Sequence, residues 1–295
     1  MAESLLQEYP LTDREFRLLS GLIREEAGIH LSEHKLQLLR ARLSKRLRAH
    51  GFSSFEEYYD HLMNDDPDGE ELLIMVNCIT TNKTEFYREA HHFNFLRETV
   101  VPALTERAKL GGGRQVRIWS AGCASGEEPY TIAITLREAL GSLLSWEIEI
   151  LASDIDTEVL EKAKKGIYPL PQTSAVPHEL LFKCFRRGTG ANQGLVKVSS
   201  EIRELITFRR VNLLDEPWPI QSSFDVIFCR NVMIYFDRAT QRRLVERFAA
   251  SLTEGGHLFV GHSESLFGLS TDLEFVQNTT YRRRKEKGNG TTREP

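Results

Sequence analysis

Residues 116–130 read VRIWSAGCASGEEPY and are the most informative segment for the fold of this chain. It is an apolar, strand-like run that leads into a loop with Gly122 and Gly126 and then into a helix start rich in carboxylates. Glycine lets a backbone turn sharply and approach a ligand where a Cβ would collide. The acids that follow suit a ligand carrying hydroxyl groups and positive charge, whereas a pyrophosphate would prefer bare amides or a lysine. The stretch therefore predicts a nucleoside-binding loop at the end of a strand.

Outward from this loop, apolar strand-like runs alternate with helical patterns. In chain order they are VRIWSA, a helix near 128–140, WEIEILASD, a helix near 157–165, ITFRRVNLL, FDVIFCRNV, a helix near 239–252, and HLFVGHS. This alternation is typical of a doubly wound, Rossmann-like parallel sheet, an α/β fold whose ligands bind at the carboxyl ends of the strands. The polar clusters of the chain fall at those ends, so we expect one ligand site there.

Helical patterns precede the sheet. Three of them lie within residues 12–62, and the ranges 70–79 and 89–109 are also helical in pattern. The predicted capping boxes pair Thr12 with Glu15 and Ser53 with Glu56. We therefore assign 1–80 to a small N-terminal all-helical domain.

A stretch rich in glycine and asparagine, RRGTGANQGLVKVSS at 186–200, interrupts the alternation. Turn-forming residues followed by an alternating LVKV run predict a small antiparallel β-subdomain, inserted over 167–204. The α/β domain that carries this insertion is expected over 81–285. The polar residues from Arg282 onward are expected to fray, with 286–295 as a polar tail.

The composition describes an ordinary globular protein. A net charge of −4 and a pI near 6.2 argue against a general nucleic-acid binder, which is usually basic. The four cysteines are scattered, without a CxxC pair or histidines at metal-ligand spacing, so no metal is predicted and a reducing cytoplasm is the expected location. No run approaches the about 18 apolar residues of a membrane span, and the N-terminus lacks an apolar leader, so we expect neither membrane insertion nor export.

Polar side chains follow successive strands of the predicted sheet. Asp154 ends the strand ILASD, where a carboxylate can accept hydrogen bonds from both hydroxyls of a ribose. The alternative role for Asp154 is a helix N-cap, although Asp156 or Thr157 can fill that role instead. Two pairs follow the next strands, Asn212 with Leu213 and Arg230 with Asn231. The first pair offers an amide for the edge of a base and an apolar contact for its face.

Five segments of the chain carry a family resemblance. They are TTNKTEFYRE, SAGCASGEEPY, ASDIDTEVLEKA, IFCRNVMIYF and GHSE. With them the chain resembles, over essentially its whole length, the bacterial chemotaxis protein-glutamate O-methyltransferases. The resemblance implies S-adenosylmethionine as the cofactor, S-adenosylhomocysteine as the product and methyl esters on glutamate side chains of chemoreceptors.

The resemblance also implies roles for single residues. Those implied to bind the cofactor are Asn82, Thr84, Arg88, Gly122, Glu128, Asp154, Asn212, Leu213, Arg230 and Asn231. Arg88 and Tyr235 are implied to lie nearest the reacting methyl, as catalytic residues that position the substrate. The acceptor needs no strong base, because a glutamate with a pKa of about 4.3 is already ionised at neutral pH. The enzyme is therefore expected mainly to align the acceptor oxygen, the methyl group and the sulfur.

Two surfaces are expected to bind the receptor. Lys35, Arg42 and Arg46 share one face of the helical segment 33–49, beside a stripe of leucines. A solvated helix side is the alternative for any one of them, but chemoreceptor methylation regions are helical and rich in glutamate, so the resemblance favours a docking face. Members of the family that tether a receptor C-terminal peptide do so through the β-subdomain, and Arg187, Gly188 and Gly190 match their pattern. Lys197 stands where such members often carry arginine, and a lysine keeps the charge but cannot form a bidentate pair with a carboxylate.

Two other functions stay open at this stage. One is a non-catalytic adapter of the same fold that binds the cofactor or the receptor for regulation. The other is a methyltransferase that acts on a small molecule or on nucleic acid. Transfer of labelled methyl groups to receptor protein would separate both from the first interpretation.

Overall fold

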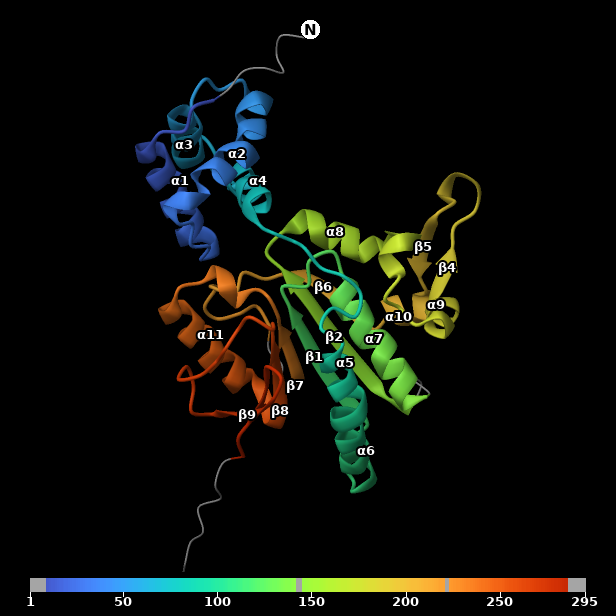
Figure 1. Cartoon of the computed structure of the whole chain (residues 1–295). Coiled ribbons are helices and arrows are strands. Elements are labelled where there is room, and N and C mark those ends of the chain that lie inside the picture. Colours follow the sequence, from blue (N-terminus) through green and yellow to red (C-terminus); the bar gives the residue numbers. More distant parts are fainter. Residues whose placement is uncertain (1–8, 142–144, 221–222, 286–295) are drawn as a thin grey trace, which may run out of the picture.

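The computed structural model describes residues 9–141, 145–220 and 223–285. They form an N-terminal group of helices, a large sheet covered by helices and a small second sheet that projects to one side (Figure 1). Within these ranges, no helix has both the length and the apolar character needed to cross a membrane. The predicted polar tail at 286–295 lies outside the described residues.

Four helices make up the N-terminal domain. They are α1 (Asp13–Ala27), α2 (Leu36–His50), α3 (Phe55–Asn64) and α4 (Glu70–Ile79). Their common core includes Ile23 of α1, Leu39 and Leu43 of α2 and Met75 of α4, all without solvent exposure. The leucine stripe of α2 is thus the face that this domain buries.

Of the two capping boxes predicted in this domain, one is present and the other is displaced. Thr12 caps α1, and its amide donates to the Glu15 carboxylate at 2.8 Å while its hydroxyl accepts from the Glu15 amide at 3.3 Å. The box predicted at Ser53 with Glu56 is wrong by one residue. Ser54 is the cap of α3 and accepts from the Glu57 amide at 3.1 Å, while the Glu57 carboxylate accepts from Ser53. Two adjacent serines and two adjacent glutamates leave the register open in the sequence.

The large sheet has seven strands in the order β6-β2-β1-β7-β8-β10-β9. Its strands are β1 (Gln115–Ala121), β2 (Glu147–Asp154), β6 (Ile206–Arg210), β7 (Phe224–Cys229), β8 (Leu252–Val260), β9 (Leu273–Gln277) and β10 (Thr280–Arg283). The first five in spatial order are parallel, and β10 is antiparallel to both of its neighbours, β8 and β9. The chain builds outward from β1 in both directions, so the crevice between β1 and β7 is the switch point at which such sheets bind ligands.

The last hairpin corrects the prediction of a frayed end. Arg282 and Arg283 lie in β10, which pairs with both β8 and β9. Tyr281 of β10 and Leu273 of β9 are buried in the core, and that burial holds the hairpin on the sheet edge. Because β10 ends in two consecutive arginines and Arg284 and Lys285 follow, the local sequence looks like a polar tail.

Helices cover both faces of the sheet (Figure 1). One face is covered by α7 (Glu127–Leu140) and by a second, continuous helix. That helix consists of α5 (His91–Phe95), a π-helical turn (Leu96–Val100) and α6 (Val101–Lys109). The other face is covered by α11 (Arg238–Ser251). Along β1, Ile118 joins the core under α7 whereas Trp119 joins the core under α11. Burial on both faces explains why the strands are apolar throughout instead of alternating.

The predicted β-subdomain is present as a three-stranded antiparallel sheet in the order β3-β5-β4. Its elements are β3 (Ile167–Pro169), α9 (His178–Cys184), β4 (Phe185–Arg187), β5 (Leu195–Val198) and α10 (Ser200–Arg203). It follows α8 (Thr157–Lys165) and projects away from the large sheet (Figure 1). The sequence patterns missed helix α9, which is one short helix between two strands.

Candidate functional site

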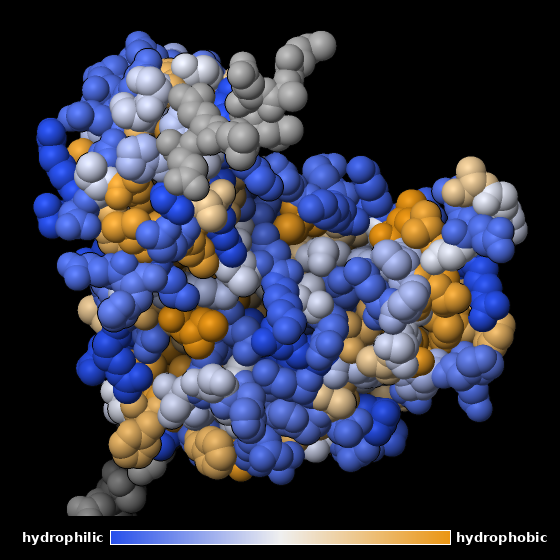
Figure 2. All heavy atoms as spheres, turned by 45° about the horizontal axis from the view of Figure 1, so that its top comes forward, coloured by the Kyte–Doolittle hydropathy of each residue, from blue (hydrophilic) through white to orange (hydrophobic). Residues whose placement is uncertain are grey.

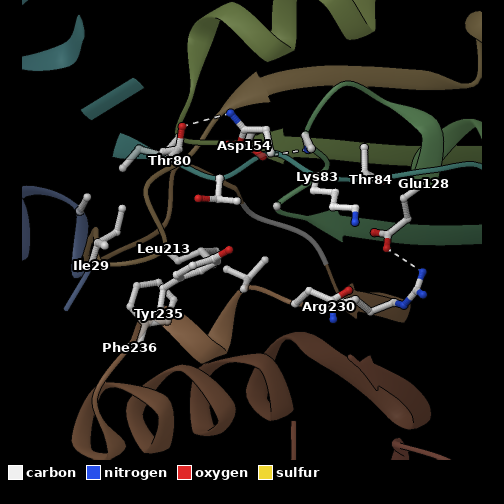
Figure 3. A pocket seen from close by; sticks show the side chains of 18 of the residues that line it. Ile29, Thr80, Lys83, Thr84, Glu128, Asp154, Leu213, Arg230, Tyr235 and Phe236 are labelled. Carbon is white, nitrogen blue, oxygen red and sulfur yellow. Dashed lines mark hydrogen bonds and ion pairs between the residues drawn. The ribbon is translucent and has the colours of Figure 1, made fainter. Parts of the chain in front are cut away.

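A cleft with an empty volume of about 970 Å³, counted to its open mouth, lies at the carboxyl ends of the parallel strands (Figure 3). The predicted cofactor residues that line it are Asn82, Thr84, Arg88, Gly122, Glu128, Asp154, Asn212, Leu213, Arg230 and Asn231, together with Tyr235. They come from five separate parts of the chain, and the switch point of the sheet brings them together.

The glycine loop after β1 forms the floor of the cleft. The amides of Gly122 and Cys123 both donate to the carbonyl of Ser153, at 2.8 and 2.9 Å, which ties the loop to the end of β2. Gly122 has a φ of +87°, and a Cβ there would lie 2.4 Å from a methyl of Val232. Gly126, with a φ of +97°, opens α7 against Ala163. Glycine at these two positions is therefore required by backbone conformation and by close packing.

Asp154 ends β2 with its carboxylate in the cleft. It accepts from the amide of Ala124 at 2.8 Å and from the amide of Asp156 at 3.0 Å. Burial raises the pKa of Asp154, and these amide hydrogen bonds oppose the rise. Two amides fix the orientation of the carboxylate and leave lone pairs for a ligand with paired hydroxyl groups. Asp156, and not Asp154, is the N-cap of α8, because it accepts from the amides of Glu158 and Val159.

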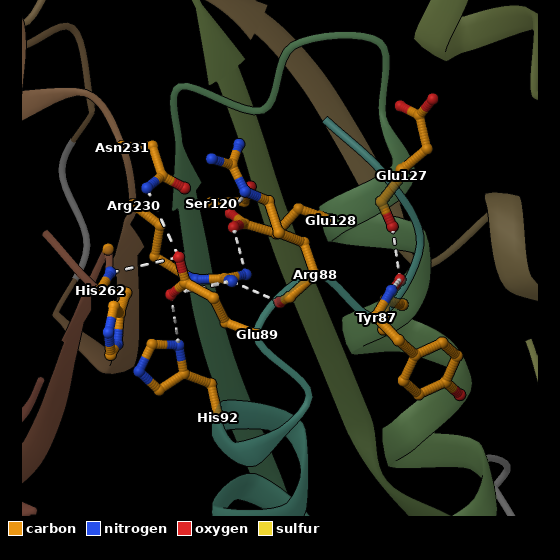
Figure 4. A network of polar contacts seen from close by, with 12 residues as sticks. Tyr87, Arg88, Glu89, His92, Ser120, Glu127, Glu128, Arg230, Asn231 and His262 are labelled. Atoms are coloured by element: carbon orange, nitrogen blue, oxygen red, sulfur yellow. Dashed lines mark hydrogen bonds and ion pairs between the residues drawn. The ribbon is translucent and has the colours of Figure 1, made fainter. Parts of the chain in front are cut away.

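A buried charge cluster forms the opposite wall (Figure 4). The guanidinium of Arg230, whose side chain is 2% exposed, lies 3.0 Å from the Glu128 carboxylate and 3.3 Å from that of Glu89. It also donates to the carbonyl of Arg88. Ser120 donates to Glu128 at 2.7 Å. Burial raises the pKa of Glu128, although Arg230 and Ser120 oppose the rise.

Glu264 holds the turn after β7 and was not among the predicted site residues. Its carboxylate accepts from the amides of Gly261, Asn231 and Ile234, at 2.6, 2.9 and 3.2 Å. Asn231 has a φ of +60°, a left-handed conformation that these hydrogen bonds support. The turn delivers Tyr235 to the cleft. The only sequence signal for Glu264 was its place in the GHSE segment.

The linker between the helical domain and the sheet forms the roof of the cleft. Thr80 and Asn82 both donate to the Asp156 carboxylate, at 2.8 and 2.6 Å. Lys83, which sequence analysis did not single out, points its amine into the cleft toward Glu128 (Figure 3). Arg88 donates to the carbonyl of Lys83 at 2.8 Å. Across the described ranges, neither the Lys83 amine nor the Arg88 guanidinium is paired with a carboxylate. Both cations in the cleft can therefore bind a carboxylate of a ligand.

The helical domain closes one side of the cleft. Ala27 and Ile29 line it, and the amide of His30 donates to the carbonyl of Tyr235 at 2.9 Å. The side-chain amide of Asn212 donates to the carbonyl of Glu26 at 2.6 Å. Asn212 was expected to offer this amide to the edge of a base, but in the structure the amide joins the two domains. Leu213 lines the cleft as expected.

The three basic residues predicted to form a docking face on the helical domain differ in their surroundings. Lys35 is exposed. Arg46 is bonded to the Glu71 carboxylate, with 2.8 Å between Nε and Oε1, and its side chain is 22% exposed. Arg42 donates to the carbonyls of Ile79 and Thr80. The predicted face is therefore turned largely toward α4, and only Lys35 is free for a partner without breaking contacts inside the domain.

The residues predicted to tether a receptor peptide lie on β4 and β5. Arg187 ends β4, an edge strand, and its guanidinium lies 5.5 Å from the ring centroid of Phe182. The amide of Gly188 donates to the carbonyl of Leu195 at 2.9 Å, and a Cβ at Gly188 would lie 2.2 Å from a carbonyl oxygen. Gly190 has a φ of +57° in the exposed turn. Lys197 lies on the central strand β5 and is exposed.

Comparison with known proteins places both domains in one family. Residues 14–80 match the family model described as the CheR methyltransferase all-alpha domain, and residues 82–282 match the CheR methyltransferase SAM binding domain. The chemotaxis protein methyltransferase 2 of Pseudomonas aeruginosa is 46% identical over 93% of this chain and 95% of its own length. The chemotaxis protein methyltransferases of Klebsiella aerogenes and Escherichia coli are 44% and 41% identical, over 96% and 94% of this chain and 94% and 93% of their own lengths. The chain therefore belongs to the CheR methyltransferase family, whose members join an all-helical domain to an S-adenosylmethionine-binding domain.

Proposed function

We propose that this protein transfers the methyl group of S-adenosylmethionine to glutamate carboxylates on the cytoplasmic helices of chemoreceptors, giving glutamate methyl esters and S-adenosylhomocysteine. The observation that carries this proposal is one cleft with two opposite kinds of charge. Asp154 and Glu128 face it as acceptors, while Lys83 and Arg88 face it as cations that pair with no carboxylate among the described residues. The enzyme would act in the cytoplasm, where these receptor helices lie.

The side chains of the cleft fit S-adenosylmethionine. Asp154, held by two amides, would accept from the ribose hydroxyls. Glu128 would face the ammonium group, and Leu213 with Ile29 would contact the base. Arg88 would hold the carboxylate of the methionine part. When bound, S-adenosylmethionine supplies a methyl group activated by a positively charged sulfur.

The protein's own contribution to the reaction is alignment and charge. A glutamate acceptor is ionised at neutral pH, so the cleft needs no general base and the chain nominates none. Because Arg88 would be occupied by the cofactor carboxylate, Lys83 is left to attract the carboxylate of the acceptor. Tyr235 enters the cleft from the turn that Glu264 holds, and would orient the acceptor there. Positioning of this kind can supply much of a rate enhancement.

The β-subdomain supports the proposal of a tethering site. Figure 2 shows apolar side chains on this lobe. Ile167 on β3 is 44% exposed and Phe182 before β4 is 57% exposed. A receptor C-terminal peptide that added a strand to the β4 edge would pair with backbone groups near Arg187 and contact Phe182. Tethering would raise the local concentration of acceptor glutamates without new contacts in the cleft.

The test is methyl transfer to purified receptor fragments with and without their C-terminal tails. Radiolabelled S-adenosylmethionine should give label on receptor protein that mild base releases as volatile methanol, because methyl esters are base-labile. Receptor fragments with the acceptor glutamates replaced by alanine are the control and should stay unlabelled. If the protein binds S-adenosylhomocysteine but labels no receptor, tailed or tailless, it is a non-catalytic adapter or modifies another substrate.

A further inference from the structure

Arg42 lies on α2 but its guanidinium reaches the end of α4. It donates to the carbonyl of Cys78 at 3.4 Å, to that of Ile79, and to that of Thr80 at 2.8 Å. These carbonyls accept no hydrogen bond within α4, because the last carbonyls of a helix lack intrahelical partners. Helix α4 has no basic residue in its own last turn. Arg42 thus supplies from a neighbouring helix the positive charge that a helix C-terminus favours.

The segment that Arg42 holds continues directly into the roof of the cleft. Arg42 also donates to the hydroxyl of Thr81 at 3.2 Å. Ile79, Thr80, Thr81 and Asn82 all line the cleft. The position of this linker relative to the glycine loop is therefore determined partly by a side chain of the helical domain.

A continuous set of hydrogen bonds runs from this linker to the carboxylate that faces the ribose site. The Thr80 hydroxyl donates to the Asp156 carboxylate at 2.8 Å, and the Asn82 amide donates to the same oxygen at 2.6 Å. The Asp156 amide donates to the Asp154 carboxylate at 3.0 Å. Asp156 is also the N-cap of α8. A shift of the linker would therefore move Asp156 and turn Asp154 away from its orientation.

We propose that Arg42 is a positioning residue for the cofactor. By holding the carbonyls at the end of α4 it keeps Thr80 and Asn82 on Asp156, and Asp156 orients Asp154. This role differs from receptor docking, the role first expected for Arg42, because its guanidinium is already bonded inside the protein. It rests on cofactor binding and does not depend on which protein is methylated.

The test is calorimetric titration of the full chain with S-adenosylhomocysteine, which requires neither receptor nor turnover. Arg42→Met removes the guanidinium and should raise the Kd about tenfold, since hydrogen bonds from a charged group are the strong ones. Arg42→Lys should recover part of the affinity, because an ammonium bonds fewer of the carbonyls than the fork of arginine. Arg48→Met is the matched control, since Arg48 is an exposed cation on the same helix, and its Kd should stay within twofold of wild type.

A second variant separates positioning from folding. Thr80→Val removes only the hydroxyl between the linker and Asp156, and it should also weaken binding of S-adenosylhomocysteine. The double variant should lose less binding free energy than the sum of the losses in the two single variants, because Arg42 and Thr80 act through the same contact with Asp156. An unchanged Kd in Arg42→Met, with a raised KM for receptor, would overturn the proposal and return Arg42 to the docking face. Fully additive losses would also overturn it, because the route would then not pass through Thr80.

Discussion

Replacing Arg230 by methionine removes the cation of the buried charge cluster and should lower the free energy of unfolding. Methionine keeps an apolar side chain but removes the guanidinium, whose carbon lies 5.4 Å from the centroid of the Phe93 ring. The carboxylates of Glu128 and Glu89 are then left in the interior without their cation. The two carboxylate side chains are only 10% and 15% exposed. Removing one partner from a buried ion pair typically costs about 3–5 kcal/mol. We expect a loss of about 4 kcal/mol in the free energy of unfolding at neutral pH.

The loss should depend on pH in a definite direction. In the wild-type protein burial alone would raise the pKa of Glu89, but Arg230 and the amide of His262 lower it below its usual value. Without Arg230, burial raises the pKa of both Glu89 and Glu128 above the unfolded value of about 4.3. The folded variant then binds more protons than the unfolded chain, so its stability falls as pH rises from the unfolded pKa. The deficit should therefore be about half as large near pH 5 as near pH 8.

Urea unfolding followed by circular dichroism at the two pH values measures this loss. Arg117→Met is the matched control, because Arg117 pairs with Glu149 at 2.8 Å on the surface, where the two side chains are 34% and 52% exposed. An exposed pair of this kind is worth at most about 1 kcal/mol. The reasoning would be refuted by a loss for Arg230→Met no larger than that of the control, or by a loss that is equal at both pH values.

Three further predictions follow from single contacts. Asp154→Asn should raise the Kd for S-adenosylhomocysteine about a hundredfold in calorimetry, since it removes charge-assisted acceptors for the ribose hydroxyls; a change below threefold would contradict the role of Asp154. Lys83→Met should raise the KM for receptor fragments about tenfold and leave the Kd for S-adenosylhomocysteine within twofold, and the reverse pattern would place Lys83 on the cofactor carboxylate. Thr12→Ala should cost about 1 kcal/mol of stability in urea unfolding by removing the α1 cap, and Thr12→Ser should retain most of it; equal losses in both would argue against capping.

The sheet and most of its helices could be predicted because their apolar patterns are long. Glu70–Ile79 and Thr157–Lys165 are helices with the predicted bounds; Gly69 precedes the first, and Asp156 and Gly166 flank the second. Short elements with mixed composition could not be predicted. Helix α9 and the hairpin of β9 with β10 are stabilised mainly by contacts with distant parts of the chain, such as Tyr281 in the core beneath α11.

Much of the cleft was visible in the sequence for a geometric reason. The carboxyl ends of parallel strands meet at one edge, so Asp154, Leu213 and Asn231 had to lie near one another once the strand order was set. Lys83 and Glu264 were missed because nothing local distinguishes a lysine that enters a cleft from an exposed one, or a glutamate that binds three amides from a turn residue. Their roles depend on where separate segments meet.

The α/β class, the glycine loop and the polar strand ends could be inferred from the amino-acid sequence, because local backbone preferences and the burial of apolar faces act over a few residues. Which charged side chains are bonded inside the protein depends on how separate segments pack together. Arg42 and Arg46 look like parts of an exposed basic face on helix α2, yet α4 packs against that side and takes both guanidinium groups. The Asn212 amide binds Glu26 for the same reason. A charged or amide side chain bonds to whatever partner the fold brings within about 3 Å, and residue spacing along the chain does not specify that partner.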